Sequence, residues 1–143
     1  MSDWRQNLID DDAGLTTVLR EARVVAVLGA KAGADEPAHY VPAYLLAQGY
    51  RILPVNPNAG TVLGVPAVGS LRELSEPVDV VDVFRRSEQV APVVDEAIAI
   101  GAKVLWMQDG VIDPDGARRA HDAGLRVVMN RCMLRDHRRL IGG

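Results

Sequence analysis

Residues 24–33 read Val24-Val25-Ala26-Val27-Leu28-Gly29-Ala30-Lys31-Ala32-Gly33, and the rest of the chain can be placed around them. The first five form a continuous apolar run rich in β-branched side chains, which is typical of a parallel strand covered on both faces. The small residues that follow predict a loop in which Gly29 and Gly33 let the backbone turn tightly and a ligand approach. The helix expected next offers unpaired N–H groups and partial positive charge, a combination that favours phosphate.

This loop does not match either of two common phosphate-binding motifs. A G-x-G-x-x-G fingerprint would need glycine where Lys31 stands, and no Gly-Lys-Ser/Thr follows as in a P-loop. Gly29 could therefore simply end a strand in a domain that binds nothing at this place. Lys31 favours the phosphate interpretation, because a lysine inside the loop can act as a flexible point charge.

Composition excludes several classes of function. The 143 residues fit one domain, 1–143, and the formal net charge of −3 provides no basic field for nucleic acid. No apolar run approaches the length of a membrane span, and the N-terminus lacks a signal-peptide pattern, so we expect a cytoplasmic protein without a membrane partner. The single Cys132 excludes an internal disulfide, and the three histidines show no metal-ligand spacing, so no metal site is assigned.

Five short apolar segments alternate with helical patterns. Strands are expected at residues 24–28, 51–55, 78–84, 103–107 and 126–129. Helices are expected at 3–22 in two pieces, about 40–48, 70–73, 87–100, 114–124 and 133–141. This alternation predicts an α/β fold, a doubly wound, five-stranded parallel Rossmann-type sheet with helices on both faces.

Individual residues refine these elements. The aspartates at 10–12 offer a helix cap, and Pro42 is expected in the first turn of its helix. Pro54 cannot donate to a ladder, so the strand that contains it is placed near a sheet edge. Asp79 and Asp82 lie three residues apart and should point to opposite faces of a strand, which favours structural roles over a working carboxylate pair.

Ligands of such sheets bind beyond the carboxyl ends of the strands, where strand order reverses. The loops expected there are 29–37, 56–60, 85–86 and 108–110, and their two arginines, lysine and small residues suit an anionic, nucleotide-like ligand. NAD usually needs an acidic residue after the second strand to bind its ribose diol. Here the neutral Asn56 leaves room for a ribose phosphate, so coenzyme A is the better fit and NADP the weaker one.

Several segments together resemble the small single-domain CoA-binding proteins of bacteria. That family is similar to the N-terminal CoA-binding domain of the succinyl-CoA synthetase alpha subunit, and the resemblance extends from about residue 15 to residue 140. The resemblance rests on these segments: Val-Ala-Val-Leu-Gly at 25–29, Tyr-Arg-Ile-Leu-Pro-Val-Asn-Pro at 50–57, Pro-Val-Asp-Val-Val-Asp-Val-Phe-Arg at 77–85, Ala-Ile-Gly-Ala-Lys at 99–103 and Val-Met-Asn-Arg-Cys at 128–132.

The resemblance implies a Rossmann-type fold and binding of coenzyme A. It implies phosphates near Gly29, Ala30 and Lys31, the ribose phosphate and adenine near Asn56 and Pro57, and the nucleotide along Phe84 and Arg85. The set of expected binding residues is completed by His39, Tyr40 and Gln108.

The sequence contains no recognisable pair of nucleophile and base, and no catalytic residue is assigned. His121 and His137 are interpreted as surface or packing residues, and Cys132 as a packing residue, with a mixed disulfide to the CoA thiol as its alternative. Non-catalytic binding of coenzyme A or an acyl-CoA is therefore the leading hypothesis. The alternatives are an enzyme acting on acyl-CoA and an NAD(P)-binding redox-sensing module.

Overall fold

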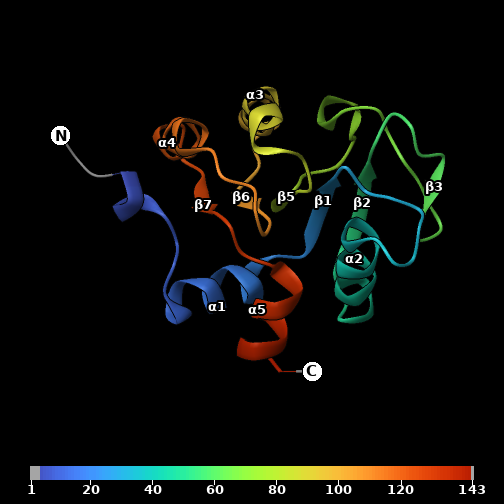
Figure 1. Ribbon diagram of the computed structural model, residues 1–143, viewed down its shortest axis with the longest axis horizontal. Helices are drawn as coiled ribbons and strands as arrows, with labels where there is room; N and C mark the ends of the chain where they lie inside the picture. The colour runs from blue at the N-terminus through green and yellow to red at the C-terminus, as the bar shows by residue number, and fades with distance from the viewer. Residues whose placement is uncertain (1–3, 143) are drawn as a thin grey trace.

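A computed structural model describes residues 4–142, and its centre is a five-stranded sheet with helices on both faces (Figure 1). Every neighbouring pair of strands in the sheet is parallel. The order across the sheet is β2 (Arg51–Val55), β1 (Val24–Leu28), β5 (Val80–Val83), β6 (Val104–Met107) and β7 (Arg126–Val128). The predicted doubly wound, Rossmann-type architecture is confirmed, and β2, which contains Pro54, lies at an edge as expected.

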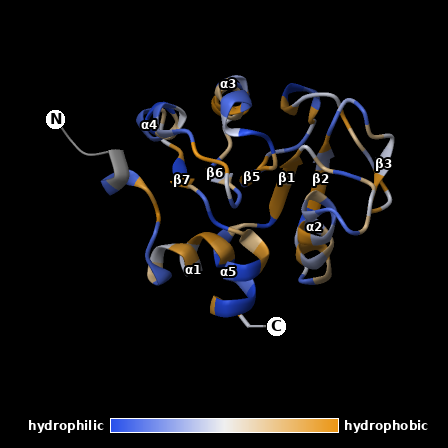
Figure 2. Ribbon diagram, in the orientation of Figure 1, coloured by the Kyte–Doolittle hydropathy of each residue, from blue (hydrophilic) through white to orange (hydrophobic). Residues whose placement is uncertain are grey.

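Two helical layers cover the sheet, and each has its own apolar core. One face carries α1 (Asp12–Glu21), α2 (Pro37–Ala47) and α5 (Met133–Leu140), and the other carries α3 (Val90–Ala99) and α4 (Pro114–Asp122). Figure 2 shows hydrophobic residues along β1 and β2 and hydrophilic residues along much of α4 and α5. Short 3₁₀ helices occur at η1 (Trp4–Asn7), η2 (Leu71–Glu73) and η3 (Ser87–Gln89).

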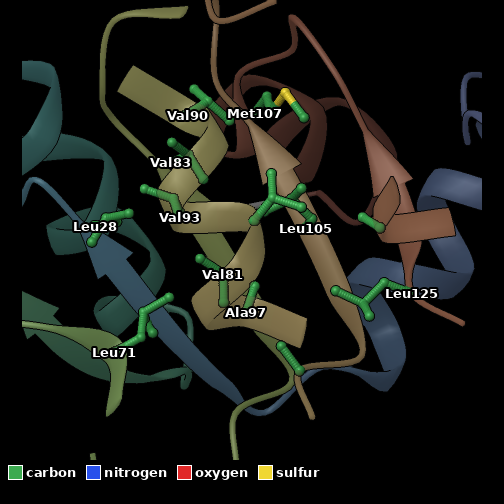
Figure 3. Packing of buried hydrophobic residues seen from close by; sticks show 14 of the residues in the cluster. Leu28, Leu71, Val81, Val83, Val90, Val93, Ala97, Leu105, Met107 and Leu125 are labelled. Carbon is green, nitrogen blue, oxygen red and sulfur yellow. The ribbon is translucent and has the colours of Figure 1, made fainter. Parts of the chain in front are cut away.

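The strands are apolar throughout because alternate side chains enter different cores. Ala26 and Leu28 of β1 belong to the cluster under α3 and α4, whereas Val25 and Val27 belong to the cluster under α1, α2 and α5. Figure 3 shows the first cluster, in which Leu105 of β6 lies with side chains of β5 and α3.

Helix α2 begins three residues earlier than the sequence pattern indicated. Pro37 occupies its first turn, so the expectation that Pro42 would do so is wrong, and Pro42 lies inside the helix. Proline has no N–H, so Pro42 cannot donate to the Ala38 carbonyl one turn before it. That carbonyl instead accepts a hydrogen bond from the Lys31 N–H at 3.3 Å, and the loop after β1 is tied to the helix.

The N-terminal segment is only partly helical. Asp11 caps α1 by accepting a hydrogen bond from the Gly14 N–H at 3.0 Å, which confirms a cap among the aspartates. The expectation of two helical pieces over residues 3–22 fails at residues 8 and 9, because Leu8 pairs in parallel with Val127 of β7. The Ile9 N–H donates to the Val127 carbonyl at 2.8 Å. Residue 3, where this expectation began, lies outside the described residues.

A small hairpin was not predicted. It pairs β3 (Thr61–Val62) with β4 (Val65–Pro66), and its turn residues Leu63 and Gly64 both have positive φ, 54° and 77°. Two consecutive left-handed residues suit a tight hairpin turn. None of the helices described is both long and apolar enough to span a membrane.

Candidate functional site

The loops after β1 and β5 meet where the strand order reverses. These strands are neighbours, yet the chain leaves β1 toward the β2 side of the sheet and returns to β5 on the other side. The Phe84 N–H donates to the Leu28 carbonyl at 2.9 Å, and the Gly29 N–H donates to the Val55 carbonyl at 2.8 Å. The carboxyl ends of three strands are thus joined at the position where ligands bind in sheets of this kind.

Gly29 is required by this junction itself. Its φ is +89°, and a Cβ at this position would lie 2.5 Å from the Phe84 carbonyl oxygen. The sequence predicted a glycine that lets the backbone turn tightly and a ligand approach, and the structure shows a turn with positive φ at which a neighbouring backbone also approaches. Ala30, the next residue, is fully buried.

Lys31 and His39 hold the exposed part of this loop, residues 31–37, against the start of α2. The His39 Nδ1 donates to the Lys31 carbonyl at 2.8 Å, which places the ring hydrogen on that nitrogen. The Lys31 ammonium lies 3.6 Å from a Glu36 carboxylate oxygen, and both side chains are about half exposed. Tyr40, in the first turns of α2, is 46% exposed.

Asn56 joins the loop after β2 to the loop after β1. Its side-chain amide donates to the Ala30 carbonyl at 2.8 Å, and its Oδ1 accepts from the Asn58 N–H at 2.9 Å. Both ends of the amide are therefore engaged in shaping the two loops, while the adjacent Pro57 is exposed.

Two arginines follow β5 at the same edge. Phe84 is half-buried against the core under α1, α2 and α5, Arg85 is half-buried and Arg86 is exposed. Neither arginine makes an ion pair or a side-chain hydrogen bond with any residue from 6 to 142. These guanidinium groups are available to an anion.

Gln108 has a structural partner. Its side chain is buried, and its Oε1 accepts the Met133 N–H at the start of α5 at 3.0 Å. Next to it, Asp109 accepts two hydrogen bonds from the Arg135 guanidinium, at 2.8 and 2.9 Å. These bonds hold the pKa of the Asp109 carboxyl below its usual value.

The structure therefore brings most of the predicted residues to one edge, in different environments. Gly29, Ala30, Asn56 and Gln108 build the loops, Lys31 and His39 brace one of them, and Pro57, Arg85 and Tyr40 are accessible. Cys132, half-buried, lies just before α5 and packs against the core under that helix. Among residues 4–142, no group of three potential metal-ligating side chains occurs.

Sequence reasoning missed a set of hydrogen bonds at this edge, which joins Ser87 and Asn130 to the loop after β6. The Ser87 hydroxyl donates to the Gly110 carbonyl at 3.2 Å and accepts from the Ile112 N–H at 2.9 Å. Asn130, in a left-handed conformation with φ +58°, accepts the Gly110 N–H at 2.7 Å. The only signal in the sequence was the turn-forming character of these residue types.

Comparison with known proteins identifies relatives over almost the whole chain. The family model described as a CoA binding domain matches residues 23–138. YneT of Bacillus subtilis (strain 168) is 36% identical over 125 residues, which are 87% of this chain and 93% of YneT. The solved structure of Prb, a PH1109 protein redesigned for binding, has a TM-score of 0.92 at 38% identity, covering 95% of this chain and 96% of Prb.

A second solved structure agrees with the first. The Thermus thermophilus protein named cell-free ID.343 has a TM-score of 0.87 at 42% identity, covering 92% of this chain and 99% of that one. These matches confirm the resemblance that the sequence motifs indicated. The chain belongs to the CoA binding domain family.

Proposed function

We propose that this protein binds coenzyme A, free or acylated, at the carboxyl edge of the sheet and without catalysing a reaction. The supporting observation is the junction of Gly29 with Phe84 at the reversal of strand order, beside two arginines without ionic partners in residues 6–142. A diphosphate and a ribose phosphate carry several negative charges, which these cations can compensate. Family membership supports the same ligand.

The phosphate contacts come mainly from side chains and from the outer part of the loop. The N–H groups of Gly29 and Lys31 already donate to backbone carbonyls, so they cannot cradle a phosphate in this conformation. The Lys31 ammonium can reach a phosphate by leaving Glu36, because an exposed ion pair of this kind contributes little. Arg85 supplies the second cation, and Asn56 contributes by fixing the loop.

Calorimetric titration with coenzyme A, dephospho-coenzyme A and NAD tests the ligand. We expect coenzyme A to bind most tightly, and loss of the ribose phosphate to weaken binding by roughly ten- to a hundredfold, since a charge-assisted contact contributes about 1.5–3 kcal/mol. Tighter binding of NAD would support the redox-sensing alternative and overturn this proposal. Saturable turnover of an acyl-CoA would support an enzyme instead.

Lys31→Ala tests the loop, with Lys103→Ala as its matched control. The two lysines are both exposed and both paired with a carboxylate, but Lys103 precedes β6 at the opposite edge of the sheet. We expect Lys31→Ala to weaken coenzyme A binding and Lys103→Ala to leave it unchanged. Equal effects of the two variants on coenzyme A affinity would show that the phosphates do not bind at the loop after β1.

A further inference from the structure

Helix α5 connects the candidate site to the opposite edge of the sheet. Its first turn is bound to the loop after β6, through Gln108 and through the ion pair of Asp109 with Arg135. His137, in the second half of α5, and Ile141, directly after the helix, line a cleft of about 270 Å³ between the ends of α1 and α2. A disturbance at His137 can therefore reach the loop at residues 108–112 through one short helix.

His137 is the point at which α5 meets α2 and the residue before β2. It is only 4% exposed, and its Nδ1 lies 2.9 Å from the Tyr44 hydroxyl of α2 in a hydrogen bond. The rings of Tyr44 and Tyr50 both pack edge-on against the imidazole, with centroids 5.4 and 5.7 Å away. The Tyr50 hydroxyl donates to the Leu19 carbonyl, so α1 is held in the same cluster.

Among the described residues near His137, no free carboxylate compensates a positive imidazole, because the adjacent Asp136 is already paired with two arginines. From the α1 side, Arg23 lines the same cleft, with its guanidinium donating to the Arg20 and Ala22 carbonyls. On α5, the Arg138 guanidinium lies 5.3 Å from the centre of the Tyr44 ring. The neighbouring Asp136 carboxylate is held by Arg131 and Arg139. The groups that face His137 from α2 and from the residue before β2 are the two phenol rings of Tyr44 and Tyr50.

We propose that His137 is a proton-sensitive latch, which holds α5 against α1, α2 and Tyr50 when neutral and releases it when protonated. Release at this end loosens the Gln108 and Asp109 contacts at the other end, and with them the loop at residues 108–112. The device is built into the fold and requires no ligand.

The direction of the pH effect follows from burial. Burial lowers the pKa of His137 below its ordinary value, so the folded protein binds this proton less readily than the unfolded chain. The contribution of the latch is therefore fully present above the ordinary histidine pKa and is lost as pH falls through the lowered one. Asp109 keeps its charge over this range because its own pKa is lowered, so its ion pair does not fail first.

Amide hydrogen exchange at about pH 7.5 and about pH 5 tests the latch, after correction for the intrinsic rates. Because the folded protein binds the His137 proton less readily than the open state does, we expect opening of residues 133–140 and 108–112 to increase several-fold at the lower pH. Amides of β1 and β5 should change much less. Equal opening of α5 at both pH values would overturn the proposal.

Two variants and a titration complete the experiment. His137→Asn can keep a hydrogen bond to Tyr44 but cannot take up the proton, so its α5 should show no pH response, whereas His121→Gln, at an exposed position of α4, should respond like the wild type. If His137→Asn does not fold, NMR titration of the wild-type histidines decides instead. Opening of α5 must follow the titration of His137, and opening that follows His39 would refute the latch.

Discussion

Gly29 occupies the closest approach between the loops after β1 and β5, and its side chain is limited to hydrogen by a backbone oxygen. Gly49 has a similar conformation, with φ +101°, but no atom lies within 4 Å of the position that its Cβ would take. The two glycines therefore separate the cost of a left-handed backbone from the cost of crowding. A large side chain at position 29 would therefore distort the junction with Phe84 itself, and an effect on ligand binding could not be separated from that distortion.

We expect Gly49→Ala to lower the free energy of unfolding by about 1–2 kcal/mol, the usual cost of a left-handed residue with a Cβ. Gly29→Ala should lower the free energy of unfolding by about 1–3 kcal/mol more than Gly49→Ala does, because the Phe84 backbone must also move. Urea denaturation of both variants measures the difference. Equal losses would show that the junction accommodates a methyl group without strain.

Asp82 is the one fully buried carboxyl in residues 6–142 whose oxygens have no hydrogen-bond partner. It lies in the central strand, in register with Val27 and Trp106, and so faces the core under α1, α2 and α5. Burial raises the pKa of Asp82 well above its ordinary value. The folded protein thus holds this proton more strongly than the unfolded chain, and stability falls as pH rises from the ordinary value through the raised one.

Asp82→Asn removes the titration while keeping the shape of the side chain. We expect the variant to exceed the wild type in unfolding free energy by about 1–3 kcal/mol at about pH 8, and by less at about pH 5, where the wild-type carboxyl is closer to neutral. Denaturant titrations at both pH values measure the difference. Because His137 titrates in both proteins, it cancels, and a difference that does not grow with pH would contradict this account of Asp82.

For single residues, the sequence predicted whether a side chain is structural better than it predicted the hydrogen-bond partners of that side chain. The spacing of Asp79 and Asp82 indicated structural carboxylates on opposite faces, and Asp79 indeed accepts the N–H groups of Arg23 and Val24 at 2.8 and 2.9 Å. That Asp82 has no hydrogen-bond partner in residues 6–142 depends on which side chains pack over the sheet, which strand periodicity does not specify. Gln108 was expected at the ligand and is bound to α5 for the same reason.

Among the elements, apolar runs identified all five strands of the sheet, because strands buried on both faces leave a continuous signal. The start of α2 was misplaced, since either Pro37 or Pro42 could have begun a helix and only the tertiary bond from Lys31 to Ala38 distinguishes them. The hairpin of β3 and β4 has two residues in each strand, too few for a periodic pattern.

The loops illustrate the same limit. Asn56 was expected at a ribose phosphate because of its position after the second strand, and the structure engages its amide with Ala30 and Asn58. Local sequence placed it directly after the second strand, where the structure has it, but its hydrogen bond to Ala30 joins segments far apart in the chain. Geometry of this kind depends on the whole sheet and on the register of β1 with β2.

At the scale of the whole molecule, the two edges of the sheet offer competing places for a ligand. The amino edge has a cavity of about 490 Å³, lined in part by Ala22, Gly101 and Gly124, where α1, α3 and α4 end. Its cations are already paired, Lys103 with Asp79 at 3.3 Å and Arg126 with Glu21 at 3.4 Å. Helices present their negative ends at this edge, which disfavours a polyanion however large the cavity is.

Reversing the charge of one arginine at each of the two edges decides which edge binds the ligand. We expect Arg85→Glu, at the carboxyl edge, to weaken coenzyme A binding by about ten- to a hundredfold, because an attractive contact becomes a repulsive one. Arg126→Glu, at the amino-edge cavity, should leave the affinity within about twofold, since a charge there is distant and screened. Wild-type affinity should also fall as salt is raised. If Arg126→Glu weakens binding and Arg85→Glu does not, coenzyme A occupies the amino-edge cavity, and the junction of Gly29 with Phe84 serves the fold alone.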